Sequence, residues 1–331
     1  MRAAIGIDVG GTKVLGVVLT AVGEVAAEQR LPTPGGTDDL VTGVVSLVDA
    51  LEGADSAGPG PLPVGIGAPG LVDRSGSVRF APNLPGINGA ELRARAERAL
   101  GPRPVVVDND ANCAGWGEAR LGAAQHARHA LMVTLGTGIG GGVVADGRLL
   151  RGADGFAGEI GHMVVDPSGP LCPCGRAGCW ERYASGSGLG RLAREAAHGG
   201  VGARLIELAG GDPEAVRGEH VTAAAAEGDP GALAVIDRFA WWLGMGLANL
   251  ANAFDPEIFV IGGGLIEAGD LLLEPTRREL GLLIEAGAVR PEVKVVAAAL
   301  GERAGAIGAA LLALEPAVTP ANGPGGPGTR R

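Results

Sequence analysis

The sequence has few aromatic residues and no excess of basic ones. Its 331 residues include one tyrosine, four tryptophans and five phenylalanines, so its cores must be built from Val, Leu, Ile and Ala. Lysine and arginine number 27 against 37 acidic residues, which gives a net charge of -10. A protein that neutralises nucleic-acid phosphates needs clustered Lys and Arg, and no such cluster is present. We therefore expect no nucleic-acid partner.

Long hydrophobic runs and cysteines are also scarce. The longest uncharged apolar run, Phe239 to Phe254, contains Gly and Asn, is too short to span a bilayer, and is expected to be a buried helix. The start of the chain runs directly into a β-rich segment, so we do not expect a signal peptide. The four cysteines suit a reducing compartment. These features favour a cytoplasmic protein with no membrane partner.

The length and the glycine content bound the architecture. A chain of 331 residues exceeds the usual size of one domain, so two domains are expected. Sixty glycines predict many tight turns and close backbone approaches. A strand, a glycine-rich turn and a second strand follow one another in both halves of the chain. This repetition predicts two related lobes that face one cleft.

The apolar patterns predict alternating strands and helices. Strands are expected at residues 3–9, 14–19, 24–31, 64–67, 105–107, 130–135, 143–145, 258–261 and 293–298. Helices are expected at residues 38–51, 89–100, 191–197, 203–208, 221–227, 233–253 and 305–314. Residues 53–63 should form a loop, and the Pro/Gly-rich segment 316–331 should be a disordered tail.

Soft metal ligands are interleaved with carboxylates between Glu159 and Glu181. Three cysteines lie within eight residues and cannot all pair with one another, while Cys113 lies far back in an alanine-rich context. The spacing predicts a structural zinc ion, with a disulfide or unrelated thiols as the alternatives. Such a metal would bring the two glutamates together and leave their oxygens free for a polar ligand. The ligand set consists of His162, Cys172, Cys174 and Cys179.

The first glycine-rich turn is a candidate phosphate-binding loop. Gly10 and Gly11 directly follow a strand, where their backbone N–H groups can approach phosphate oxygens, and Thr12 and Lys13 add further donors. Asp8, at the end of that strand, is placed to hold a magnesium ion through water. Taken alone, the same glycine pair is also compatible with an ordinary hairpin turn.

Two further glycine-rich segments strengthen the interpretation. The segment 135–142 contains Thr137 and Gly138, and strands ending in glycine loops from both lobes would clamp one polyphosphate. Neither loop matches the Walker A pattern, and the second is not a Rossmann fingerprint because a strand is expected to follow it. The third segment, with Gly263 and Gly264, could let the base or ribose of a nucleotide approach the backbone. It could equally be a helix N-terminus without a ligand.

Polar residues follow the apolar strand 105–107. Asp108, Asn109 and Asp110 lie where α/β sheets place their ligands, at the carboxyl end of a strand. Phosphoryl transfer to an alcohol requires a group that accepts the hydroxyl proton, and one of these aspartates is the candidate. N-capping of a helix by Asp108 or Asp110 is the open alternative.

Taken together, these residues resemble the ROK family of sugar kinases and repressors, and within it the bacterial glucokinases. The resemblance runs from Asp8 to about Leu314. It implies an α/β fold of the actin-like ATPase (ribonuclease H-like) type, with two α/β lobes around a central cleft. The small lobe would comprise residues 1–112, completed by a C-terminal helix at about 300–315, and the large lobe residues 113–299 with the zinc site. The segments that carry the resemblance are residues 8–13, 109–110, 135–142, 159–162 and 172–181.

The resemblance also implies an activity and a set of site residues. The chain would transfer the γ-phosphoryl group of ATP, bound with Mg²⁺, to the 6-hydroxyl of glucose, with Asp110 as general base. His162 would serve both metal and sugar, one ring nitrogen for each. The remaining sugar hydroxyls would be held by Asn83, Asn109, Glu159, His162 and Glu181. ATP and its metal would be bound by Asp8, Gly10, Gly11, Thr12, Lys13, Thr137, Gly138, Gly263 and Gly264.

The chain departs from the family pattern at two positions near the expected site. Ile87 stands where family members often carry Trp, and Cys113 where Ala is common. Neither change touches the chemistry, but Ile87 leaves the shape of the sugar pocket open. Two lobes around a cleft also predict closure on sugar binding, which would exclude water and limit ATP hydrolysis.

Alternative substrates and an alternative class of function are compatible with the resemblance. Mannose, fructose, allose and N-acetylmannosamine kinases share the motifs, and polyphosphate replaces ATP in some relatives, although polyphosphate users tend to lack the cysteine cluster. The family also contains sugar-responsive repressors, which carry an additional N-terminal helix-turn-helix domain for which the start of this chain leaves no room. A regulator acting through protein contacts is the remaining alternative. The resemblance favours a homodimer or homotetramer.

Overall fold

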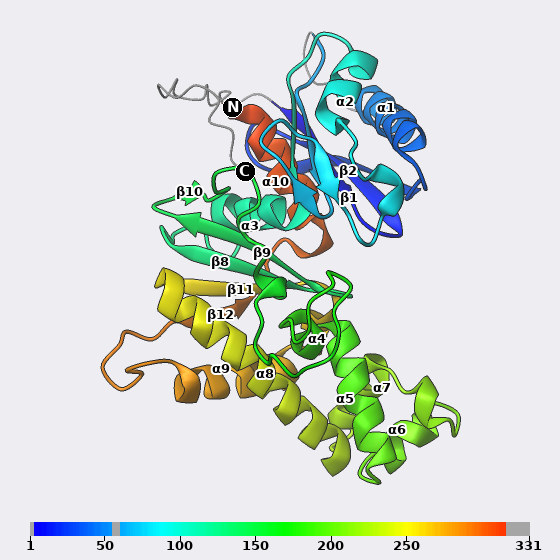
Figure 1. The fold of residues 1–331 in the computed structure, drawn as a ribbon. Helices are drawn as coiled ribbons and strands as arrows, with labels where there is room; N and C mark the ends of the chain where they lie inside the picture. Colours follow the sequence, from blue (N-terminus) through cyan, green and yellow to red (C-terminus); the bar gives the residue numbers. More distant parts are fainter. Residues whose placement is uncertain (1–2, 55–59, 316–331) are drawn as a thin grey trace, which may run out of the picture.

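The computed structural model describes residues 3–54 and 60–315, and two five-stranded sheets form its framework (Figure 1). The first sheet has the order β3-β2-β1-β4-β7 and the second β10-β9-β8-β11-β12. The strands of the first are β1 (Ala4–Val9), β2 (Lys13–Leu19), β3 (Val25–Pro32), β4 (Val64–Ala68) and β7 (Val105–Asn109). Those of the second are β8 (Ala130–Leu135), β9 (Ile139–Ala145), β10 (Arg148–Leu149), β11 (Ile258–Gly262) and β12 (Lys294–Ala297). A separate hairpin consists of β5 (Leu71–Val72) and β6 (Val78–Phe80).

The two sheets follow one plan. Each sheet contains an antiparallel hairpin, β1–β2 in the first and β8–β9 in the second. Two further strands run parallel to the first strand of that hairpin, so β1-β4-β7 corresponds to β8-β11-β12. The carboxyl ends of parallel strands meet at one edge of a sheet, where α/β proteins bind their ligands. The repeat seen in the sequence is therefore a repeat of sheet topology, and each half contributes one such edge.

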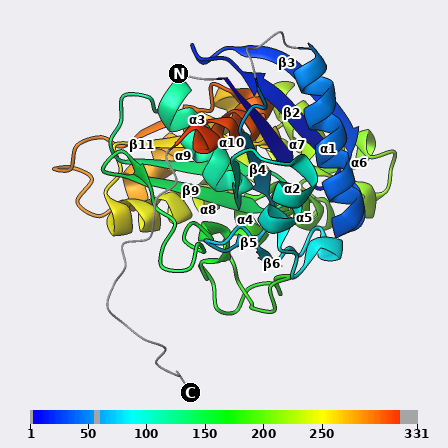
Figure 2. The same cartoon turned by 90° about the horizontal axis from the view of Figure 1, so that it is seen from above.

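Helices cover the outer faces of both sheets. Helix α1 (Thr37–Ala54) lies along β2 and β3 (Figure 2), and α2 (Leu92–Leu100) packs near β7. Beside the second sheet, α8 (Pro230–Phe254) packs against α9 (Asp270–Leu283). The end of the molecule farthest from the first sheet is helical (Figure 1). It contains α5 (Gly186–His198), α6 (Ala203–Leu208) and α7 (Gly218–Ala226), and α4 (Glu181–Ala184) precedes them.

Helices α3 (Asp110–Leu121) and α10 (Ala304–Leu314) pack on each other between the two sheets (Figure 1). Helix α3 follows β7 of the first sheet but contacts β8 and β9 of the second. Helix α10 follows β12 of the second sheet but contacts β1 and β4 of the first. Glycines allow this approach, because a Cβ at Gly308 would overlap the backbone oxygen of Cys113 and one at Gly65 would overlap that of Ala309. The last helix of each half is thus packed against the other half.

A buried carboxylate also stabilises the contact between α3 and the segment that leads into α10. Glu118 on α3 is only 1% exposed. It accepts hydrogen bonds from the backbone N–H groups of Ala123 (2.7 Å), Ala299 (3.1 Å) and Leu300 (2.8 Å). The first donor follows the end of α3, and the other two lie on the segment that leads into α10. One side chain therefore satisfies three backbone donors on two connections between the sheets.

Most expected strands and helices are present, and the differences have physical causes. The helix expected over 89–100 begins at Leu92, because Gly89 has a φ of +74° and the next residue, Ala90, accepts a hydrogen bond from Val78. Residues 140–142, expected in a turn, lie inside β9, where a side chain on Gly142 would meet the backbone of α3. Helix α9 was not expected, since Pro275 inside it disfavours a helix on sequence grounds.

The run Phe239 to Phe254 lies in α8, where Phe239, Leu243 and Leu247 are fully buried and Trp241 is partly exposed. No helix within residues 3–54 and 60–315 is both long and apolar enough to cross a membrane. Helix α3 was expected only in the alternative in which Asp108 or Asp110 caps a helix, and the β5–β6 hairpin was not expected. The first two residues of the expected loop 53–63 belong to α1, and residues 55–59 lie outside the described residues. Residues 1–2 and the expected tail 316–331 also lie outside them.

We predict that Glu118→Gln lowers the free energy of unfolding by about 1–3 kcal/mol. The amide keeps one acceptor oxygen where the carboxylate has two, so at least one buried N–H loses its partner. Urea denaturation of wild type and variant measures the change. Glu97→Gln on α2 is the matched control, since Glu97 forms an exposed pair with Arg93 and should change stability by less than about 1 kcal/mol. Equal effects at both positions would contradict the role of Glu118.

Candidate active site

The polar segment after β7 forms the start of α3, and its three side chains have different environments. Asn109 is the N-cap of α3, because its Oδ1 accepts a hydrogen bond from the backbone N–H of Asn112 at 3.0 Å. The alternative in which Asp108 or Asp110 caps the helix is therefore wrong. The Nδ2 group of Asn109 donates to the Gly70 carbonyl at 3.0 Å, so both ends of this amide are in use within the protein.

Asp108 is a structural anchor. It is 7% exposed, and its Oδ1 accepts from the backbone N–H of Asn109 (2.8 Å) and from Nδ2 of Asn112 (3.0 Å). Its Oδ2 accepts from Nε of Arg151 at 2.6 Å. Because donors occupy both oxygens, Asp108 is poorly suited to take a substrate proton. Of the two aspartates, Asp110 is the better candidate base.

Asp110 and Asp8 lie together in an environment that disfavours negative charge. Gly67 lies between them, since a Cβ there would be 3.4 Å from Cα of Asp110 and 3.5 Å from Oδ1 of Asp8. Burial raises the pKa of Asp110 to about 6, and the negative charge of nearby Glu159 also raises it. Burial raises the pKa of Asp8 to about 7, and the charge of Asp110 adds to the effect. Raised carboxyl pKa values of this kind are typical of proton-transfer sites.

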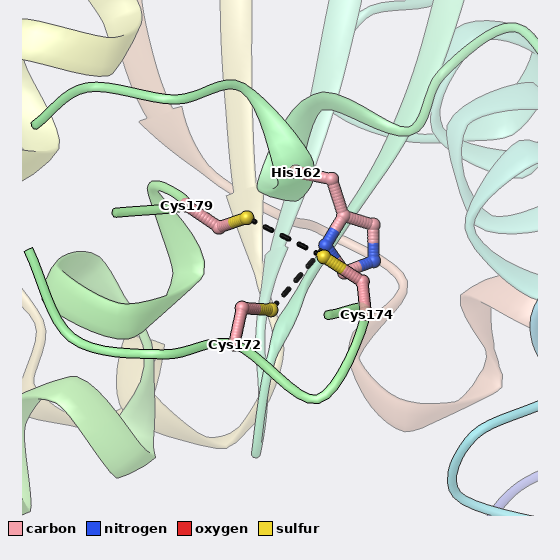
Figure 3. A group of neighbouring side chains, drawn as sticks. All are labelled: His162, Cys172, Cys174 and Cys179. Carbon is pink, nitrogen blue, oxygen red and sulfur yellow. Dashed lines mark hydrogen bonds between the residues drawn. The ribbon is translucent and has the colours of Figure 1, made fainter. Parts of the chain in front are cut away.

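The His162 and cysteine side chains form a compact cluster (Figure 3). Their four ligand atoms lie within 4.8 Å of one another. Nδ1 of His162 is 3.7 Å from Sγ of Cys172, and the Sγ atoms of Cys174 and Cys179 are 3.6 Å apart. A tetrahedral zinc ion with bonds of ~2.3 Å separates its ligands by ~3.8 Å. The three thiols are free rather than disulfide-bonded, and the donor set fits zinc.

The cluster is anchored to the rest of the second half by the residue that follows it. Trp180 is fully buried, and its Nε1 donates to the Trp242 carbonyl on α8 at 2.8 Å. Gly246 leaves room for the indole ring, because a Cβ at that position would overlap it. Helix α4 begins at the next residue, Glu181. The position of Glu181 is therefore set by Cys179 and Trp180 immediately before it.

Two carboxylates flank the imidazole of His162. Oε2 of Glu159 lies 3.8 Å from Nε2, and Oε1 of Glu181 lies 3.8 Å from Nδ1. Glu181 also accepts from the Cys172 thiol at 2.9 Å. Burial raises the pKa of Glu159, and its charge reaches Asp110 on the other half. The structure thus brings Glu159, His162 and Glu181 into one polar group. The start of α3, which carries Asp110, lies close to Glu159, since a Cβ at the preceding Gly158 would be 3.4 Å from Oδ1 of Asn112.

The first glycine turn is bound to the edge of its sheet. The N–H of Gly10 donates to the Lys13 carbonyl at 3.0 Å, and the Thr33 hydroxyl donates to the Gly10 carbonyl at 2.7 Å. Thr33 N–H also donates to the Thr12 carbonyl at 3.1 Å. Gly11 is exposed with open space beside it. The turn therefore offers an accessible backbone of defined shape.

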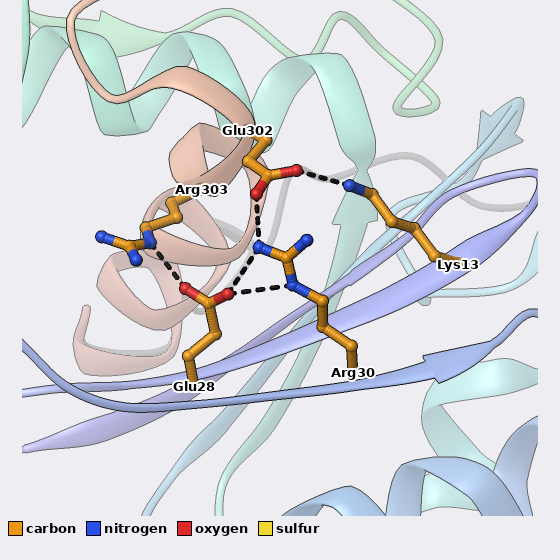
Figure 4. Close-up of polar contacts among 5 residues, drawn as sticks. All are labelled: Lys13, Glu28, Arg30, Glu302 and Arg303. Carbon is orange, nitrogen blue, oxygen red and sulfur yellow. Dashed lines mark hydrogen bonds and ion pairs between the residues drawn. The ribbon is translucent and has the colours of Figure 1, made fainter.

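The side chain of Lys13 is engaged in an ion-pair network (Figure 4). Its ammonium donates to Glu302, which also accepts from Arg30. Arg30 in turn donates to Glu28 at 2.9 Å through Nε, and Glu28 accepts from Nε of Arg303 at 2.6 Å. The network joins β2 and β3 to the 3₁₀ turn before α10 (Gly301–Arg303). A phosphate bound by Lys13 would have to compete with Glu302.

The second and third glycine loops adjoin each other. Thr137 is exposed, and a Cβ at Gly138 would overlap Oε2 of Glu181, so this loop lies against the polar group around His162. Gly263 has a φ of +85°, and a Cβ there would lie 2.5 Å from the carbonyl oxygen of Leu135 at the end of β8. Gly264 begins a 3₁₀ turn rather than an α-helix.

Two residues of the expected sugar site are placed differently from the rest. Asn83 is exposed in the turn after β6, and its side chain makes no hydrogen bond to any other described residue. Ile87 is fully buried in the core of the first half, so it does not line an open pocket. The residues that sequence reasoning missed are Arg151, Glu118 and Glu302. Their partners lie 43, 181 and 289 residues away, and no local pattern signals such pairs.

Comparison with known proteins identifies the family. Residues 4–316 match the ROK family. The glucokinase of Streptomyces coelicolor is 43% identical over 319 residues, which cover 96% of this chain and 99% of that protein. The crystal structure of a ROK family glucokinase from Streptomyces griseus in complex with glucose and AMPPNP is 40% identical, covers 94% of this chain and 98% of that chain, and has a TM-score of 0.82. The xylose repressor of Bacillus subtilis is 28% identical, with 94% of this chain and 77% of the repressor covered.

The match to the Streptomyces griseus structure confirms the actin-like ATPase fold with its mixed α/β sheets. On the family match and on the identity to full-length relatives, this chain belongs to the ROK family.

Proposed function

We propose that this chain phosphorylates glucose at its 6-hydroxyl, with ATP as donor and Asp110 as general base. The observation that carries the proposal is the grouping of Asp110, with a pKa raised to about 6, beside Glu159 and the His162 cluster. Glucokinases of Streptomyces, Halalkalibacterium halodurans and Thermotoga maritima are 38–43% identical to this chain over 93–99% of their own length. One of the similar structures contains glucose and a nucleotide analogue.

The residues of the site suit an in-line transfer to an alcohol. The proton leaves the sugar hydroxyl for Asp110, the hydroxyl oxygen forms a bond to the γ-phosphorus, and the bond from that phosphorus to the β-γ bridging oxygen breaks to release ADP. A base with a pKa near the working pH is suited to both accepting and releasing the proton. Glu159, Glu181 and Nε2 of His162 pair with the other ring hydroxyls, since carboxylates accept from two hydroxyls at once.

We propose zinc as the structural ion of the cluster. Nδ1 of His162 faces the thiols and Nε2 faces Glu159, which supports a division between metal and sugar. A metal bond to Nδ1 would hold the proton on Nε2 and fix the ring orientation, so that His162 donates to a sugar hydroxyl. The ligands would be His162, Cys172, Cys174 and Cys179.

Magnesium and the nucleotide are proposed to bind at the glycine loops. When bound, Mg²⁺ would neutralise negative charge on the phosphates. We propose Asp8 as the carboxylate that would hold it, because Asp8 lies at the end of β1 just before the turn of Gly10, Gly11 and Thr12. The second loop and Gly263 would contact the rest of the nucleotide. The family resemblance supports a homodimer or homotetramer, and the cysteine content supports a cytoplasmic location.

We expect Asp110→Asn to lower kcat about 10²- to 10⁴-fold while glucose still binds. The amide cannot accept the hydroxyl proton as the carboxylate does, but it preserves the size and polarity of the side chain. A coupled ADP assay across a panel of hexoses gives the rates and the sugar preference, and calorimetry gives glucose affinity. Asp39→Asn, at an exposed position of α1, is the control and should leave the rate unchanged. Wild-type turnover by Asp110→Asn would refute the assignment of the base.

The raised pKa values of Asp110 and Asp8 predict an acid limb in the pH profile. A base must be ionised to accept a proton, and a carboxylate must be ionised to hold Mg²⁺. As the pH falls through 7 and then 6, both groups gain protons and kcat/KM for glucose should decline, by about tenfold per pH unit or more below pH 6. Initial rates from pH 4.5 to 8.5 measure this limb. A profile that stays flat down to pH 5 would argue against either group being needed in ionised form.

Removal of one thiol ligand should remove the metal and weaken sugar binding together. Cys174→Ser is expected to reduce zinc from about one ion per chain to a small fraction of that, measured by mass spectrometry of the purified protein, and to raise KM for glucose about tenfold or more. Cys113→Ala is the matched control, because Cys113 is a buried free cysteine outside the cluster. If wild type contained no zinc, or Cys174→Ser retained it, the metal assignment would fail.

A further inference from the structure

The segment between β10 and the 3₁₀ turn at Ile160–His162 touches both sheets. We call residues 150–158 the strap, since they run from the second sheet to Glu159. Three of its glycines have positive φ values: Gly152 (+73°), Gly155 (+109°) and Gly158 (+103°). Positive φ values are energetically unfavourable for residues with a side chain, so these glycines allow the backbone path of the strap. The strap leads directly into the candidate sugar-binding residues.

Arg74, at the tip of the β5–β6 hairpin, makes the main contact with the strap. Its Nε donates to the carbonyls of Gly152 (3.1 Å) and Ala153 (2.9 Å), and its Nη2 also donates to Gly152. Its backbone N–H donates to the Asp154 carbonyl at 3.0 Å. All of the acceptors are backbone oxygens, so the contact depends on the path of the strap and not on its side chains.

The hairpin itself is shaped to present Arg74. The carboxylate of Asp73 accepts from the backbone N–H groups of Ser75 (2.9 Å) and Ser77 (3.0 Å), which closes the turn. The pair that it forms with Arg79 lies outside this turn, since Arg79 is an exposed residue of β6. The hairpin is in turn connected to the catalytic edge, because Gly70, just before β5, accepts a hydrogen bond from Asn109. Arg74 therefore projects from a turn of defined shape.

The strap makes a second contact with the first half, the pair of Arg151 with Asp108. Asp108 is buried beside the start of α3, whereas Arg74 reaches the strap from outside, at an exposed position. Any movement that separates the hairpin from the strap must break the hydrogen bonds of Arg74. The same movement would carry Glu159 away from Asp110, because Glu159 directly follows the last residue of the strap.

We infer that Arg74 is a positioning residue: it fastens the strap to the first half of the molecule and so places Glu159 and His162 opposite Asp110. Within residues 3–54 and 60–315, the Arg74 side chain donates hydrogen bonds to backbone carbonyls of the strap and to no proposed sugar-binding group. Its effect should therefore fall on sugar binding and not on the chemical step. The inference rests on the proposed function, since it assigns Glu159 and His162 to the sugar.

The test compares Arg74→Ala with Arg79→Ala. Both changes remove one arginine from the same hairpin, but Arg79 pairs only with Asp73 and does not reach the strap. Arg74→Ala should raise KM for glucose on the order of tenfold, as expected for loss of a charged hydrogen bond, with kcat within about threefold of wild type. Arg79→Ala should leave both parameters within about twofold. Arg74→Lys, which retains one donor group, should fall between wild type and Arg74→Ala.

Hydrogen exchange of the strap gives a second readout that is independent of turnover. The amides of residues 150–158 should exchange faster in Arg74→Ala than in Arg79→Ala, and saturating glucose should restore part of the protection. Equal KM values and equal exchange in the two variants would overturn the inference. A uniform rise in exchange across the chain would do the same, because it would indicate general destabilisation. If wild type formed no ADP with glucose, the proposed function would fail, and the exchange of the strap would still test the fastening.

Discussion

The reciprocal packing of α3 and α10 is the constraint on which the site depends. Each helix follows one sheet and packs on the other, and small residues such as Gly308 and Gly65 let the backbones come close. Glu118 satisfies donors on both connections. Asp110 is the first residue of α3. Asp8 adjoins the first turn of α10, because a Cβ at Gly305 would lie 2.6 Å from its carboxylate. The contact between α3 and α10 therefore sets the distance between these two acidic groups.

The environment of the acidic residues in the candidate site disfavours their negative charge. Burial raises the pKa values of Asp8, Asp110 and Glu159. A neighbouring negative charge adds to the effect at each: Asp110 acts on Asp8, Glu159 on Asp110 and Glu181 on Glu159. Proteins retain such arrangements where a cation or a proton transfer makes use of them. A magnesium ion and the sugar hydroxyls would supply the missing positive charge and donors. The acidic site and the zinc-type cluster are therefore complementary, since the cluster holds Glu159 and Glu181 apart on either side of His162.

Much of the candidate site could be predicted from local sequence because its parts are contiguous. The three cysteines within eight residues, the glycine turn after β1 and the polar segment after β7 each carry their chemistry in one short stretch. Other features could not be predicted. Asp108 and Asp110 look alike in the sequence, and only the approach of Arg151 from the strap separates the anchor from the candidate base. Lys13 is a phosphate ligand by pattern, yet the structure joins it to Glu302.

The sequence by itself determined the repeat of strand, glycine turn and strand, the candidate metal-ligand set and the family, because these depend on residue type and on spacing along the chain. Tertiary structure alone decided which aspartate pairs with Arg151, where the strap is fastened and how each of α3 and α10 packs against the sheet of the other half. The physical reason is that these contacts join groups that lie tens to hundreds of residues apart. Their geometry exists only after both sheets have formed and packed.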